Sequence, residues 1–116
     1  MIPVIQPGLL LIPTCKGIEL IHTPDVIRIE AISNYSKIYF LGGKTLVVSK
    51  VLKWFEESLA ATQFIRVHRT HIVNKLFIDR YIKAEGYKVG LTNGELVEVS
   101  RRKKTLVIQS LYSLAA

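Results

Sequence analysis

The chain has 116 residues, of which 49% are hydrophobic and 22% charged; this fits one domain with a buried core and is too short for two. Sixteen Lys and Arg residues against nine Asp and Glu residues give a formal net charge of +7, which predicts attraction to a polyanion. No apolar run is long enough to span a membrane, and no cationic signal segment opens the chain, so we expect a cytoplasmic protein with no membrane contact.

The positive charge is concentrated in the second half of the chain. Up to Ser58 there are six cations and five anions, and after it ten cations and four anions. The single cysteine, Cys15, cannot form an intrachain disulfide and is expected to be a packed or half-buried side chain.

Most of the chain is typical of short strands. Residues 1–8, which contain two prolines, are expected to be a linker or lead-in before a domain over residues 9–116. In residues 26–32, Ile27, Ile29 and Ala31 alternate with charged residues, a period of two that buries one face of a strand. Strands are expected at residues 9–13, 17–22, 26–32, 37–41, 45–49, 64–68, 77–84, 87–92 and 95–100, a number that predicts mostly antiparallel hairpins.

The first polar segment between two expected strands is the loop of residues 33–37. It holds Asn34, Tyr35, Ser36 and Lys37, which offer donors, acceptors, a ring and a cation. Such a loop either reads base edges or simply turns the chain, and its composition by itself favours the turn.

Two helices interrupt the strands. The first is expected over residues 50–60, where Leu52 and Phe55 share one face and Ser49 is a candidate N-cap. The second is expected over residues 101–113, with Val107 on its apolar stripe and Ser100 as its N-cap.

The second helix begins with Arg101-Arg102-Lys103-Lys104. Cations there oppose the helix dipole by a few tenths of a kcal/mol each, up to ~1. A sequence that breaks a local rule in this way is expected to serve function, here contact with an anionic backbone. A solvated charge run is the alternative.

Residues 65–74 form a second basic segment, with Arg66 and His68 on one side of a strand. His68 and His71 invite a metal hypothesis, but two histidines at this spacing on a strand or turn do not converge, and no other ligands complete a site. We therefore expect no metal, and at least one of the two to be hydrogen-bonded to the backbone.

The register of the hairpin near Asn93 can be predicted from its apolar residues. A three-residue loop over residues 92–94 places Val89 opposite Val97 and Tyr87 opposite Val99, whereas a two-residue turn does not. Gly94 then takes the left-handed conformation.

No enzyme motif is present, and aspartate occurs only as Asp25 and Asp79, so we expect no catalytic activity and no cofactor. Two binding functions remain open from the residues alone. One is a module for single-stranded nucleic acid, and the other is a protein-interaction module for an acidic partner. The rings that could stack bases in the former are Tyr35, Tyr39, Phe40, Tyr81 and Tyr87.

Several segments together resemble the LytTR family of bacterial DNA-binding domains, over residues 9–111. They are residues 25–31, Ser33-Asn34-Tyr35, Val48-Ser49-Lys50, residues 64–74 and residues 97–102. The resemblance implies a mainly β, elongated antiparallel fold of small sheets with a short central helix and a C-terminal helix. It also implies binding through loops inserted in successive major grooves, as part of a transcriptional regulator.

The resemblance implies roles for individual residues. Arg101 matches a residue that contacts bases in one major groove, and the loop of Asn34, Ser36 and Lys37 matches a base-contacting loop in another. Arg69 falls near the intervening backbone or minor groove. His68 and Asn74 are expected to hold the local structure, with a phosphate contact open to His68. The other expected backbone contacts are Arg66, Lys75, Arg102, Lys103 and Lys104.

The resemblance also implies partners. Members usually follow a receiver or another sensory domain controlled by a sensor kinase, so this chain is either a C-terminal domain cut from a longer regulator or a stand-alone version. The expected assembly is a dimer on paired DNA half-sites.

Overall fold

The structure is a computed structural model and describes residues 8–115. Within them are ten strands in three antiparallel sheets, with orders β1-β2, β5-β4-β3-β7-β6 and β10-β9-β8. The strands are β1 (Leu9–Thr14), β2 (Gly17–His22), β3 (Val26–Ile32), β4 (Tyr35–Phe40), β5 (Thr45–Val48), β6 (Phe64–His68), β7 (His71–Asn74), β8 (Ile78–Lys83), β9 (Tyr87–Leu91) and β10 (Leu96–Val99). The helices are α1 (Leu52–Ser58), α2 (Lys104–Leu114) and the 3-10 turns η1 (Thr23–Asp25), η2 (Lys75–Phe77) and η3 (Arg101–Lys103). The predicted mainly β fold of small sheets with two helices is confirmed.

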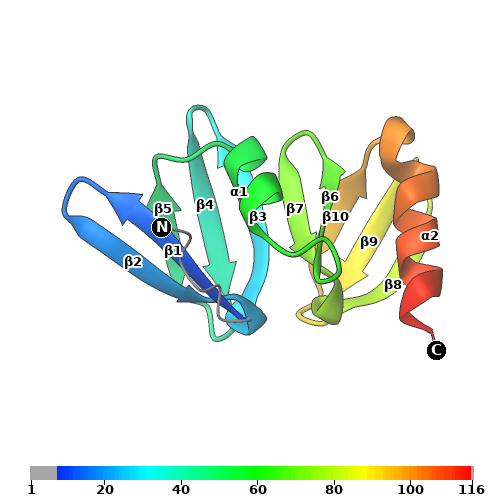
Figure 1. Ribbon diagram of the computed structural model, residues 1–116. Coiled ribbons are helices and arrows are strands. Elements are labelled where there is room, and N and C mark those ends of the chain that lie inside the picture. The colour runs from blue at the N-terminus through cyan, green and yellow to red at the C-terminus, as the bar shows by residue number, and fades with distance from the viewer. Residues whose placement is uncertain (1–7, 116) are drawn as a thin grey trace.

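The five-stranded sheet lies between the β1–β2 hairpin on one side and the three-stranded sheet with α2 on the other (Figure 1). A hydrophobic core lies against each of its faces. The first core joins this sheet to the β1–β2 hairpin and α1, with Phe55 and Ile12 fully buried. The second joins it to the three-stranded sheet and α2, with Val89 and Val107 fully buried. The molecule measures 43 × 33 × 27 Å along its principal axes, and within residues 8–115 no helix is long and apolar enough to cross a membrane.

Strand β7 was missing from the predicted elements. It has only four residues, and two adjacent residues within it, Ile72 and Val73, are both buried, one in each core. A strand buried on both faces has no alternation of apolar and polar residues, so the period-two test does not detect it.

Strand β3 departs from the predicted alternation at its start. Its pairing with β4 shifts between Val26 and Arg28, a β-bulge at Ile27. The bulge sends Ile27 into the second core, while Val26 and Ile29 contribute to the first. The expectation that a single face of this strand is buried is therefore wrong, because one extra residue exchanges the two faces.

The β9–β10 hairpin follows the predicted register. Val97 pairs with Val89, and Val99 pairs with Tyr87. Gly94 has φ +91 in the three-residue loop, as the loop requires.

The predicted helix caps are wrong. Helix α1 starts after Val51 without a side-chain cap, so Ser49 has no capping role. Ser100 precedes η3 and makes no capping hydrogen bond, and α2 proper starts only at Lys104. Cys15 is exposed in the β1–β2 turn, not packed. The predicted lead-in lies outside the described residues except for Gly8.

Candidate nucleic-acid interface

Three turns lie along one edge of the molecule, at the top of Figure 1: residues 33–34 between β3 and β4, residues 69–70 between β6 and β7, and residues 100–103 after β10. The amide of Ala31 donates to the carbonyl of Thr70 at 2.9 Å, and the amide of Ser100 donates to the carbonyl of Val67 at 2.9 Å. These bonds join neighbouring turns, so the three follow one another in that order. We call this row the turn edge.

The β3–β4 turn is shorter than the predicted loop of residues 33–37. Strand β4 already begins at Tyr35, which pairs with Ile32. Ser33 bridges the strands in the left-handed conformation, with φ 55. Asn34 and Tyr35 are exposed at the tip.

Ser36 is not on the surface, contrary to the expected base contact. Its side chain is 0% exposed, and its hydroxyl donates to the carbonyl of Lys50. Lys37 points to the other face of β4, where its ammonium lies 5.1 Å from the centre of the Tyr39 ring. Of the residues expected to contact bases from this loop, Asn34 and Lys37 keep accessible polar groups.

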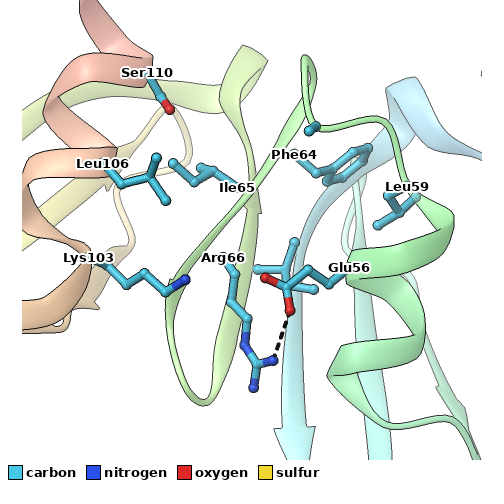
Figure 2. Close-up of a pocket in the computed structure, with 10 residues that line it drawn as sticks. Glu56, Leu59, Phe64, Ile65, Arg66, Lys103, Leu106 and Ser110 are labelled. Carbon is cyan, nitrogen blue, oxygen red and sulfur yellow. Dashed lines mark hydrogen bonds and ion pairs between the residues drawn. The ribbon is translucent and has the colours of Figure 1, made fainter.

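The β6–β7 turn presents Arg69, which is exposed. Beneath it, Arg66 donates from Nη2 to the carbonyl of Arg69 at 2.7 Å and from Nε to the carbonyl of His68 at 3.4 Å. Its Nη1 pairs with Glu56 of α1 at 3.2 Å (Figure 2). Arg66 is therefore engaged by the protein itself, which does not favour the phosphate contact expected for it.

A chain of hydrogen bonds fixes the two histidines of this turn. The amide of Thr70 donates to Nδ1 of His68, which must therefore be unprotonated, and the Thr70 hydroxyl lies 2.8 Å from the same nitrogen. That hydroxyl also lies 3.0 Å from Nδ1 of His71, whose Nε2 lies 3.4 Å from Nη1 of Arg28. Burial lowers the pKa of His71, consistent with a neutral ring. As predicted, one histidine accepts a hydrogen bond from the backbone.

Lys75 is the second expected contact that the structure buries. Lys75 is only 8% exposed, and its ammonium donates to the carbonyl of Ala61 at 3.0 Å. A phosphate contact from Lys75 would require breaking this bond and opening the turn, so we remove it from the candidate interface.

The four cations after β10 occupy different environments. Arg101 and Arg102 are exposed, and Lys103 is half-buried. The three form η3, so they precede α2 and do not make up its first turn. Lys104 donates to the hydroxyl of Tyr87 at 3.1 Å. This hydrogen bond and the lysine charge lower the pKa of Tyr87.

The rings that could have stacked single-stranded bases are mostly engaged by the protein. Arg28 lies 3.7 Å above the Tyr39 ring. Tyr81 and Tyr87 stack on each other at 5.7 Å, against the second core. Tyr35 is 52% exposed but stands at the tip of its turn.

A small hollow of about 170 Å³ lies behind the turn edge, between α1, β6 and α2. Figure 2 shows Leu106 of α2 facing Ile65, and Lys103 of η3 extending toward Arg66, which pairs with Glu56. Its volume is below the roughly 300–1,000 Å³ of typical small-molecule pockets. Within residues 8–115, no group of three or more His, Cys, Asp and Glu residues is placed to hold a metal ion.

Comparison with known proteins gives one family and one similar structure. Residues 16–111 match the family described as the LytTr DNA-binding domain. A search of curated proteins finds no match. Among solved structures, the LytTr DNA-binding domain assigned to a methyl-accepting/DNA response regulator from Bacillus cereus is similar, with 24% sequence identity and a TM-score of 0.75. The similarity covers 91% of this chain and 98% of that one.

Proposed function

The chain belongs to the LytTR family of DNA-binding domains, and we propose that it binds double-stranded DNA sequence-specifically, as the output domain of a bacterial transcriptional regulator. The turn edge is the proposed binding surface. The observation that carries this proposal is that one edge gathers three turns, each with an exposed polar or cationic side chain: Asn34, Arg69 and Arg101.

The order of the turns supports insertion into successive major grooves. The β6–β7 turn lies between the other two, because Ala31 at the end of β3 bonds Thr70 and Ser100 after β10 bonds Val67 of β6. We therefore propose that the outer turns enter the major grooves on either side of one minor groove, with the β6–β7 turn over the minor groove itself.

The exposed residues of the turn edge suit different tasks. Arg101 has the guanidinium fork that pairs with O6 and N7 of guanine, while Asn34 and Lys37 supply polar groups for the other major groove. We assign contacts with the backbone or the minor groove to Arg69, Arg102 and Lys103. His68 retains its Nε2–H as a donor to a phosphate, because Nδ1 is occupied.

The direct test is fluorescence anisotropy on an operator obtained by binding-site selection and on random duplexes. We expect Arg101→Ala to lose about 1–3 kcal/mol of its operator preference, the contribution of one bidentate contact. Arg80→Ala is the matched control, because Arg80 is exposed on β8 away from the turn edge. Full operator preference in Arg101→Ala would overturn the assignment of base readout.

Salt dependence tests the backbone contacts. With about six phosphates contacted, affinity should fall roughly a thousandfold between 50 and 200 mM salt. Arg102→Met should reduce the slope by about 0.9, whereas Lys104→Met should change it less, because Tyr87 holds that ammonium. Preference for unpaired oligonucleotides would favour a single-stranded binder. The absence of salt-sensitive binding to any duplex would favour an acidic protein partner.

We further propose that the domain acts as a dimer on paired half-sites. In a longer regulator, a receiver or another sensory domain and its sensor kinase would control that dimer. The isolated domain is then expected to bind a single half-site weakly. Sedimentation of the domain on duplexes with one and with two half-sites measures the stoichiometry, and a single copy bound to the paired site at saturation would contradict the dimer.

A further inference from the structure

The side chain of Arg66 points at the turn that presents Arg69, and its guanidinium donates to the carbonyls of His68 and Arg69 and to the carboxylate of Glu56. We propose that Arg66 is a positioning residue, which together with Glu56 fixes the β6–β7 turn in the conformation that offers Arg69 to DNA. This inference rests on the proposed function and assigns Arg66 a role other than a phosphate contact.

The turn needs such a support because its strands are irregular next to it. The pairing of β6 with β7 shifts between Arg66 and His68 and resumes at His68, which pairs with His71, so the ladder is irregular just before the turn. Arg66 adds bonds to the turn at this irregularity. Its Nη2 bonds the carbonyl of Arg69 at 2.7 Å, and its Nε bonds the carbonyl of His68 at 3.4 Å.

Glu56 anchors this support to a separate element. Its carboxylate accepts from Nη1 of Arg66 at 3.2 Å, and it lies on α1, which is packed into the first core through Phe55. The planar guanidinium can donate to three acceptors at once, whereas an ammonium cannot span them in the same geometry. Figure 2 shows the carboxylate meeting the guanidinium beside the hollow.

The charges also argue for positioning. An unpaired carboxylate at a DNA-binding edge would repel phosphates, and the 3.2 Å ion pair cancels its charge. The Arg66 side chain is 23% exposed and Glu56 43% exposed. A phosphate at Arg66 would compete with Glu56 and with the two turn carbonyls for the same guanidinium.

Arg66→Lys is the decisive variant, because it keeps the charge and removes the three-way geometry. We expect its preference for operator over random duplex to fall about tenfold, the loss typical of one disturbed contact, with an unchanged salt slope. Arg80→Lys, at an exposed position on β8 away from the turn edge, is the matched control and should stay within about twofold. Operator preference retained by Arg66→Lys would overturn the proposal, as would a reduced salt slope.

Glu56→Gln is an independent test of whether Arg66 supports the turn or contacts DNA directly. If Glu56 supports the turn, operator preference falls while binding to random duplexes holds or tightens. If Arg66 instead contacts DNA directly, loss of the carboxylate tightens binding to both duplexes alike, and the proposal fails.

Amide hydrogen exchange without DNA makes the inference testable even if the proposed function fails. The Thr70 amide donates to His68, and the Ala31 amide donates to Thr70. Both should exchange several-fold faster in Arg66→Lys, while core amides of β9 keep their rates. Equal changes in the exchange rates of all amides would indicate a general loss of stability. Unchanged exchange rates at the turn would show that the turn needs no support. Either result overturns the positioning role. Absence of operator preference in the unmutated chain would count against the proposed function alone.

Discussion

Asn74 lies fully buried at the end of β7, and its side-chain amide joins three segments. Oδ1 accepts from the amide of Leu76 at 3.0 Å and so caps η2. Nδ2 donates to the carbonyl of Val26 at 2.8 Å and to that of Thr23 at 3.4 Å. The structural role predicted for Asn74 is confirmed.

Asn74→Ala should destabilise the domain by about 1–3 kcal/mol, because it leaves the buried carbonyl of Val26 and the part-buried amide of Leu76 without their partner. Urea unfolding measures the change. Gln109→Ala, on the exposed face of α2, serves as the control and should change stability by no more than about 0.5 kcal/mol. A loss below about 1 kcal/mol for Asn74→Ala would mean that water replaces its bonds.

The surroundings of single residues also explain why residue type did not identify the binding residues. Lys75 directly follows the basic segment that contains Arg69. The Lys75 ammonium bonds a backbone carbonyl, whereas the Arg69 side chain is exposed. Ser36 and Asn34 are separated by a single residue, and only Asn34 is exposed. The partner that removes each side chain from the surface comes from another element, so the local sequence does not reveal it.

At the scale of elements, the β9–β10 hairpin was predicted correctly in both register and loop length. Apolar residues had to share a face, and one glycine had to take a positive φ. Both requirements arise within about twelve residues of sequence, so no distant contact could alter them.

Gly94→Ala tests the second requirement. A Cβ at this position would meet no atom within 4 Å, so any cost comes from the backbone conformation at φ +91. We expect a loss of about 1–2 kcal/mol in urea unfolding. Thr92→Ala, in the same exposed loop, is the control; a Gly94→Ala variant as stable as this control would show that the loop relaxes to another turn type.

At the scale of the whole molecule, a polar contact joins the two larger sheets beside the second core. Arg28 of β3 makes two bonds to Glu95 in the β9–β10 loop, at 3.0 and 3.2 Å, while its guanidinium lies over Tyr39. Arg28 is 12% exposed and Glu95 39% exposed. The hydrogen bond from Arg28 lowers the pKa of Glu95.

This coupling gives stability a pH dependence. A carboxylate whose pKa is lowered by folding contributes stability above its ordinary value of 4.5 and loses that contribution as pH falls through the folded value. Between pH 7 and pH 3, the unmutated chain should therefore lose more stability than Glu95→Gln, by up to about 1 kcal/mol for so exposed a pair. Glu98→Gln, exposed on β10 and without an ion pair within residues 8–115, should follow the unmutated chain in urea titrations at both pH values. Parallel pH curves for Glu95→Gln and the unmutated chain would contradict the coupling.

The sequence by itself determined most of the strands, the register of one hairpin, the two helices and the family, because these depend on periodicity, turn chemistry and the order of short motifs. Only the tertiary structure decided the rest. Strand β7 escaped detection because two cores bury it, and the bulge at Ile27 depends on pairing with β4. Arg66 and Arg69 both appear in the sequence as cations of one basic segment. Folding gives them different surroundings. Glu56 of α1, ten residues before Arg66 in the chain, pairs with Arg66, whereas Arg69 stays exposed on the turn edge.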